Sequence, residues 1–146
     1  MTGAGDDRPV AGAQPAELVV VPTALQLFRY SAVTWNSHRI HYDPAYAAAE
    51  GHRGVLVQSH LHAALALRVM TEYLGPAWRV TAFGYRIRHP AAPGDTLRFR
   101  GTVVEADDDH VRAELTEHNQ DDVRCLEGTV ELERVEPERM DPEHGR

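Results

Sequence analysis

Several features that define common protein classes are missing from this sequence. Cys125 is the single cysteine, so an intramolecular disulfide is excluded and a cytoplasmic location is predicted. No apolar run reaches the roughly 20 residues of a membrane-spanning helix. The first residues, MTGAGDDRPVAGAQPAE, carry two acids before any base and have no apolar centre, which argues against a signal peptide. Because no thiol motif surrounds Cys125, we interpret it as a packing residue.

An excess of positive charge is also lacking. The formal net charge is -7, and nonspecific binding of nucleic acid requires a basic face, so we predict no nucleic-acid partner. The lack of a membrane-spanning run predicts no membrane partner. A local basic pocket for a phosphorylated ligand is still compatible with this charge.

The sequence is otherwise that of one domain, with 146 residues of which 42% are hydrophobic. Residues 1–16 are rich in Ala, Gly, Pro and Asp, and residues 136–146 are charged and contain proline. We predict that both segments are disordered and that the ordered domain spans residues 17–135.

The first half of this domain has short elements followed by one long helix. A β-branched run at 18–21 precedes a segment at 25–35 that is compatible with a strand or a short helix. Asp43 and Pro44 then predict the start of a short helix that ends at Gly51. From Ser59, a plausible helix cap, the sequence SHLHAALALRVMTEYLG is apolar on most sides, which predicts a helix buried on most sides and ending at Gly75.

The second half alternates apolar and polar residues with a period of two. The segments are 79–89, 95–105, 111–116 and 129–133, and turn-like residues separate them. This pattern predicts antiparallel strands with one face in water. The predicted fold class is α+β, a single hot-dog domain in which an antiparallel sheet wraps around a long central helix. Because such a sheet has free edges, we expect a dimer.

Two phrases resemble a known family. LFRYSAVTWNSHRIHYD (27–43) and, less specifically, YRIRHPAAPGDTL (85–97) are similar to the MaoC-like hot-dog hydratases and dehydratases. The subgroup that they resemble most includes mesaconyl- and itaconyl-CoA hydratases and mitochondrial 3-hydroxyacyl-thioester dehydratases. The resemblance covers residues 20–135. Longer members carry two hot-dog halves, and this chain resembles the catalytic half.

The resemblance implies the catalytic residues. The family pairs an Asp with a His five residues later, and these positions fall on Asn36 and His41. Asn36 cannot titrate, so His41 is expected to exchange protons while Asn36 orients a water molecule or the substrate carbonyl. A capping histidine and a plain turn asparagine are the alternative interpretations.

The resemblance also implies the substrate-binding residues. In the family a His-Gly pair opens the buried helix and donates to the thioester oxygen, whereas this sequence has Gln58 and Ser59. His60 is expected to line the pocket, and His62 less so. Arg39 is expected to bind a CoA phosphate or a substrate carboxylate, or else to form a solvent-facing ion pair.

The predicted reaction is the reversible addition of water to a 2-enoyl-CoA or a 2-enoyl acyl-carrier-protein thioester. Two alternatives stay open: a thioesterase or an enzyme that adds an amine, and a supporting subunit of a hot-dog heterodimer. No cofactor is predicted. No metal is predicted either, because neither a cysteine nor a pair of acids completes a coordination sphere around His38 and His41.

Overall fold

The computed structural model describes residues 9–135, so the disorder predicted for residues 1–8 and 136–146 lies outside the described residues. Four helical elements lie in the first half of the chain: α1 (Ala24–Thr34), the 3-10 helix η1 (Arg39–His41), α2 (Pro44–Ala49) and α3 (Ser59–Leu74). The strands are β1 (Leu18–Val20), β2 (Trp78–Ile87), β3 (Leu97–Ala106), β4 (His110–His118) and β5 (Arg124–Arg134).

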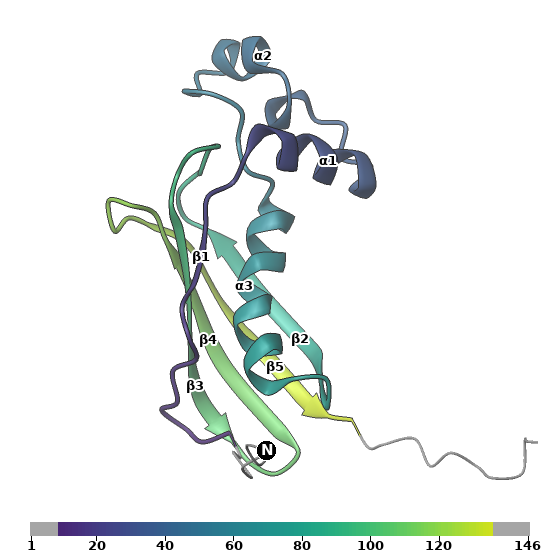
Figure 1. Cartoon of the computed structure of the whole chain (residues 1–146), viewed down its shortest axis with the longest axis vertical. Helices are drawn as coiled ribbons and strands as arrows, with labels where there is room; N and C mark the ends of the chain where they lie inside the picture. Colours follow the sequence, from purple (N-terminus) through teal and green to yellow (C-terminus); the bar gives the residue numbers. More distant parts are fainter. Residues whose placement is uncertain (1–8, 136–146) are drawn as a thin grey trace, which may run out of the picture.

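The five strands form one antiparallel sheet in the order β1-β3-β4-β5-β2. The long helix α3 runs along one face of this sheet (Figure 1). This arrangement confirms the predicted α+β hot-dog fold. In the described part of the chain, no helix is long and apolar enough to cross a membrane.

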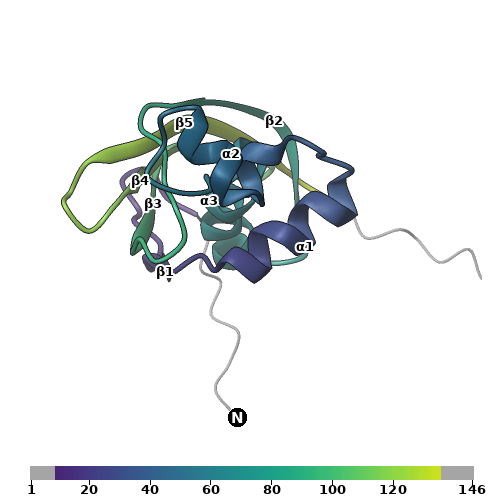
Figure 2. The same ribbon diagram turned by 90° about the horizontal axis from the view of Figure 1, so that it is seen from above.

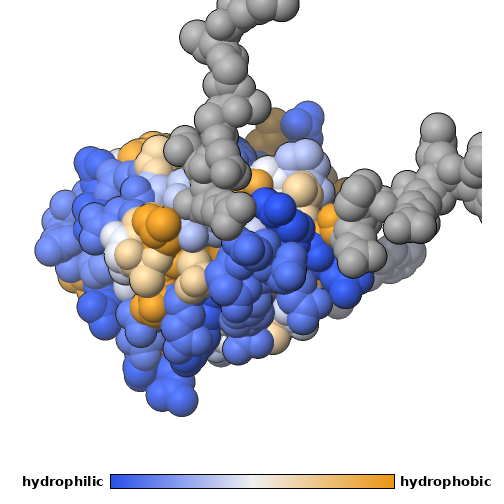
Figure 3. Space-filling model, turned by 90° about the horizontal axis from the view of Figure 1, so that it is seen from below, coloured by the Kyte–Doolittle hydropathy of each residue, from blue (hydrophilic) through white to orange (hydrophobic). Residues whose placement is uncertain are grey.

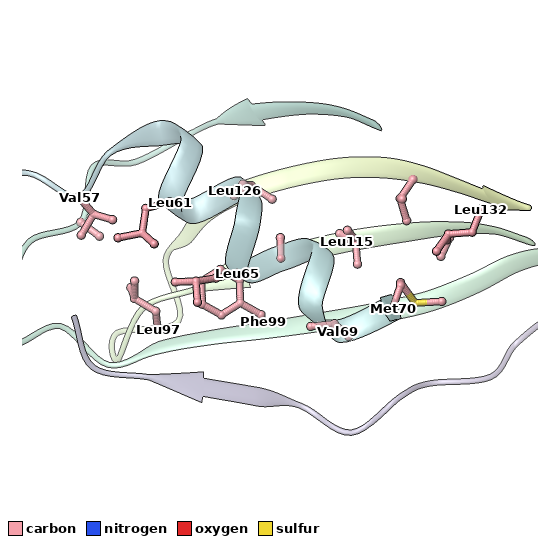
Figure 4. Packing of buried hydrophobic residues seen from close by; sticks show 14 of the residues in the cluster. Val57, Leu61, Leu65, Val69, Met70, Leu97, Phe99, Leu115, Leu126 and Leu132 are labelled. Atoms are coloured by element: carbon pink, nitrogen blue, oxygen red, sulfur yellow. The ribbon is translucent and has the colours of Figure 1, made fainter. Parts of the chain in front are cut away.

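The core lies between α3 and the sheet. Leu65 and Met70 of α3 meet Phe99 of β3 and Leu115 of β4 (Figure 4). Each fully buried side chain of this kind contributes about 1.5–3 kcal/mol to folding. Gly101 of β3 lies under the helix, where an added Cβ would be 3.1 Å from both Val69 and Met70. A side chain at this position would therefore require the side chains of Val69 and Met70 to shift.

A layer formed by α1, η1 and α2 lies across one end of the domain. Figures 1 and 2 show this layer above the first turn of α3. The opposite end is mostly hydrophilic, with an apolar area left of centre and further apolar residues elsewhere on this face (Figure 3). The first turn of α3 is thus the place where the sheet, the central helix and the terminal layer come together.

Three local expectations are decided by the structure, and two of them need correction. The first is an open alternative: the segment at 25–35, compatible with a strand or a short helix, forms the helix α1, because the Thr23 hydroxyl accepts from the N–H of Gln26 and caps a helix there. Ser59 is the first residue of α3; the cap position belongs to Gln58, whose side chain makes no capping bond. Residues 9–16, predicted to be disordered, include Gly12 and Ala13, which exchange backbone hydrogen bonds with Val103 of β3. The predictions at Asp43, Pro44 and Gly75 are confirmed.

Cys125 is fully buried, which agrees with its interpretation as a packing residue. Burial is the main reason that the pKa of its thiol rises to about 11, and the neighbouring Glu117 and Asp95 raise it further. A thiol of this kind is protonated at neutral pH and is a poor nucleophile.

We expect Gly128→Ala to destabilise the domain and Gly84→Ala to leave it nearly unchanged. A Cβ at Gly128 would lie 2.7 Å from the carbonyl oxygen of Gly84, whereas a Cβ at Gly84 would meet nothing within 4 Å. Urea denaturation should show a loss of about 1–3 kcal/mol for Gly128→Ala and a change within about 0.5 kcal/mol for the control. Equal losses of stability in the two variants would mean that the contact of the added Cβ with the carbonyl of Gly84 does not cause the destabilisation.

Candidate active site

The turn that carries Asn36 and His41 is built by its own side chains. The N–H of His38 donates to Asn36 Oδ1 at 3.2 Å, and the N–H of Ile40 donates to His38 Nδ1 at 3.3 Å. These local bonds cap η1 in the way that short acceptor side chains cap turns and helices. They fix the turn that ends at His41, the last residue of η1.

His41 is held in one orientation by the strand-like segment before α3. Its ring nitrogen Nδ1 lies 2.8 Å from the carbonyl oxygen of Leu56, and the N–H of Leu56 donates to the carbonyl of Ile40 at 3.0 Å. A carbonyl oxygen only accepts, so Nδ1 carries the hydrogen and Nε2 keeps its lone pair. The ring is therefore arranged to take a proton at Nε2.

The electrostatic surroundings of His41 keep it neutral. Burial is the main cause that lowers its pKa below the ordinary value of 6.5, and the positive charge that His38 can carry lowers the pKa further. The hydrogen bond to Leu56 opposes this shift. The rings of His38 and His41 are 5.9 Å apart. At neutral pH, His41 is therefore available as a base.

Asn36 lies beside an apolar hollow at the surface of α1. The hollow has a volume of about 290 Å³ and is lined by Phe28, Ser31, Ala32, Trp35, Asn36, Ser37 and Tyr42. The oxygen of the Asn36 side chain caps the N–H of His38, whereas its Nδ2 has no hydrogen-bond partner among residues 9–135. No hydrogen bond joins Asn36 to His41 within these residues.

The first turn of α3 follows directly after the segment that holds His41. Ser59 and His60 are exposed, and their N–H groups donate no hydrogen bond within the described chain, as expected at the start of a helix. The N–H groups of Leu61 and His62 both bond to the carbonyl of Gln58. Two free donors and the positive end of the helix dipole are thus available there to a negatively charged oxygen.

The side chain of Gln58 points away from solvent. It is fully buried, and its Nε2 donates to the carbonyl of Leu27 at 2.7 Å and to the hydroxyl of Ser31 at 2.9 Å. Its Oε1 is buried and has no partner among the described residues. Gln58 therefore fastens α1 to the start of α3, a role that the sequence analysis missed. Its predicted contact with substrate stays a prediction.

Arg39 forms the ion pair that was one of its two expected roles. Its guanidinium bonds to Asp43 at 2.5 and 3.0 Å and lies 4.7 Å from the centre of the Tyr46 ring. Its side chain is 58% exposed, so it remains accessible to a ligand. Within residues 9–135, no group of three or more His, Cys, Asp or Glu side chains is arranged to hold a metal ion.

A second hollow, of about 580 Å³, lies over β2, β4 and β5. Its lining includes Arg86, Glu114 and Glu127, and none of its lining residues comes from α1, η1, α2 or α3. We therefore locate the candidate site at the smaller hollow, which is next to the turn that carries His41.

Comparison with known proteins identifies the family. The model of a family described as hydroxyacyl-thioester dehydratase type 2 matches residues 4–93, which include the whole candidate site. The chain belongs to this family. The resemblance to MaoC-like hydratases and dehydratases is thereby confirmed.

Individual relatives are hydratases. Mesaconyl-C(4)-CoA hydratase of Chloroflexus aurantiacus is 34% identical over 134 residues, which are 85% of this chain and 45% of that protein. The chain thus spans about half the length of this relative. A solved structure of the ChsH1-ChsH2 complex from Mycobacterium tuberculosis has a chain with a TM-score of 0.80 and 25% identity, covering 86% of this chain and 98% of that one. The unliganded R-hydratase PhaJ1 from Pseudomonas aeruginosa has the same fold, with a TM-score of 0.81 and 24% identity over 88% of this chain and 84% of that one.

Titration of the histidine rings by NMR should show that His41 has a pKa below 6.5, because burial and His38 both disfavour its charged form. In His38→Asn, which keeps a side-chain acceptor for the N–H of Ile40, the pKa of His41 should rise because a neighbouring positive charge is gone. The amide chemical shift of His110, the first residue of β4, should be the same in both proteins and serves as an internal control. A His41 pKa unaffected by His38→Asn would contradict the electrostatic coupling of the two rings.

Proposed function

We propose that this protein is an enoyl-thioester hydratase, which in the reverse direction is a 3-hydroxyacyl-thioester dehydratase. The observation that carries the proposal is the state of His41. Its bond to the carbonyl of Leu56 leaves Nε2 free, and burial favours the neutral ring. Leu56 lies three residues before Ser59, where the unpaired N–H groups of α3 begin. Membership of the hydroxyacyl-thioester dehydratase family supports the same reaction.

In the proposed reaction, Nε2 of His41 takes a proton from water while the water oxygen bonds to the β-carbon of the enoyl thioester. The electrons of the carbon–carbon double bond move toward the carbonyl, and negative charge develops on the thioester oxygen. The imidazolium then returns the proton to the α-carbon, so that one water molecule is added and His41 is regenerated. Dehydration follows the same steps in reverse.

The developing negative charge needs donors that are already in place. We assign this role to the N–H groups of Ser59 and His60 at the start of α3, which have no partner within the described chain. Asn36 Nδ2 is a further donor, which can hold the attacking water or the substrate carbonyl. In this assignment Asn36 contributes orientation and His41 contributes the proton transfer.

The charge distribution supports a thioester with an anionic carrier, either CoA or an acyl carrier protein. From Leu18 to Tyr42 the sequence has no Asp or Glu but has Arg29, Arg39 and two histidines, although the whole chain has a net charge of -7. This segment contains the turn of the candidate site and the apolar hollow beside Asn36. An anionic carrier and an apolar acyl group both find complementary surface there.

A second hot-dog chain is also part of the proposal. Strand β2 has ten residues and pairs with β5 on one side; within the described chain, no strand pairs with its other side. An unpaired edge of this length favours association with another strand. The ChsH1-ChsH2 complex, which has a chain of the same fold, is an assembly of two kinds of chain. The partner proposed here is either a second copy or a different hot-dog chain.

Hydratase activity can be measured with crotonyl-CoA by the loss of the enoyl-thioester absorbance, with a thiol reagent run in parallel. We expect activity without thiol release in the wild type and a fall in kcat of about 10²–10⁴-fold in His41→Ala, because the base is lost. His110→Ala, on the hairpin between β3 and β4, is the matched control and should keep the wild-type rate.

Each other outcome has a defined meaning. Thiol release would indicate a thioesterase, and unchanged activity in His41→Ala would remove the proposed base. Absence of both signals in the wild type, with CoA and carrier-protein substrates alike, would contradict the proposed function for this chain acting alone.

The mass of the protein in solution tests the proposed association with a second chain. The chain has a mass of 16.3 kDa, so light scattering of the purified protein should give about twice that value for a homodimer. A monomer that gains activity only after addition of another hot-dog chain would indicate a heterodimer. A monomer with full activity would contradict the need for a partner.

A further inference from the structure

A histidine and a glutamate are paired inside the core, in a place that the proposed reaction does not use. Nδ1 of His62 in α3 lies 2.8 and 2.7 Å from the two carboxylate oxygens of Glu117 in β4. The side chains are 1% and 0% exposed. Glu117 also acts on the Cys125 thiol of β5, whose pKa it helps to raise.

Such a pair adds little to the stability of a domain. Removing two polar groups of this kind from water has a large cost, which their mutual attraction roughly offsets when the geometry is good. Apolar side chains of similar volume often stabilise a core as well or better. Leu65, three residues after His62 on α3, and Leu115, two residues before Glu117 on β4, belong to the apolar core. An apolar pair would therefore suit these two buried positions. The His62–Glu117 pair is therefore expected to have a role other than stabilising the core.

The location of the pair indicates this role. His62 lies in the first turn of α3, where its N–H donates to the carbonyl of Gln58 at 3.1 Å. The side chain of His62 ties this turn to β4, while the side chain of Gln58 ties the same turn to α1 through Leu27 and Ser31. The turn is thus fixed from two sides by directional bonds, which hold a position more narrowly than apolar contacts do.

We infer that the His62–Glu117 pair is a positioning device that holds the first turn of α3, and with it the N–H groups of Ser59 and His60, at the place where the thioester oxygen binds. This inference rests on the proposed function for the identity of that oxygen. His62 and Glu117 act through the helix backbone, and neither needs to contact the substrate.

The test uses the full chain with both residues replaced, His62→Leu with Glu117→Leu. Glu117→Gln is the conservative variant, which keeps an acceptor for His62 and removes the charge; it also serves if the double variant does not fold. Arg68→Ala is the matched control on the same helix, because it breaks the exposed pair Arg68–Glu72.

The first measurement is amide hydrogen exchange, which does not depend on activity. In the double variant, we expect the amides of residues 61–63 to exchange about tenfold faster or more, while those of residues 69–72 at the other end of α3 keep their protection. Glu117→Gln should show a smaller increase at 61–63, and Arg68→Ala none. Unchanged exchange at residues 61–63, or an equal increase at both ends of the helix, would overturn the inference.

The second measurement is the kinetics with crotonyl-CoA. We expect kcat of the double variant to fall about 10- to 100-fold with little change in KM, because displaced donors stabilise the transition state less well. The kcat of Glu117→Gln should lie between that of the double variant and that of the wild type. Faster exchange at residues 61–63 together with a wild-type kcat would overturn the inference. If the wild type itself shows no hydratase activity, the proposed function fails, and the exchange measurement still decides whether the pair positions the turn.

Discussion

The burial of α3 is the constraint on which the rest of the structure depends. Seven of the 16 residues of α3 are buried, and they form the face that lies on the sheet, whereas Arg68 and Glu72 are exposed. Without the sheet, water would contact much of the apolar area of this face. The sheet solves this problem by running its long strands along the helix (Figures 1 and 4). Gly101 allows close contact at one position of this packing.

Burial of the helix body has a consequence for its first turn. The N–H groups of a first turn cannot bond within the helix, so they need other partners or access to a ligand. In this protein the sheet does not cover them, and the layer of α1, η1 and α2 lies over this end of the domain instead (Figure 2). The same layer carries His41 and Asn36. The candidate base His41 bonds to Leu56, and the chain leads from Leu56 directly into the first turn of α3, which carries the free N–H groups.

The precision of this arrangement comes from a few polar bonds between segments that are distant in the sequence. His41 bonds to the backbone of Leu56, and Gln58 bonds to Leu27 and Ser31 of α1. On the opposite side, His62 bonds to Glu117. The apolar core brings these elements together, whereas the polar bonds choose one orientation among those that the core allows.

The sequence by itself determined the elements whose signals are local. Alternation along β3 and β4, the cap and proline at Asp43 and Pro44, and the glycine at Gly75 all act within a few residues, and the family phrase at 27–43 pointed to Asn36 and His41. Only the tertiary structure decided the tautomer of His41, the inward direction of Gln58 and the pairing of His62 with Glu117. Their partners lie 15 to 55 residues away in the chain, and no local pattern specifies which distant carbonyl or carboxylate the fold brings within hydrogen-bonding distance.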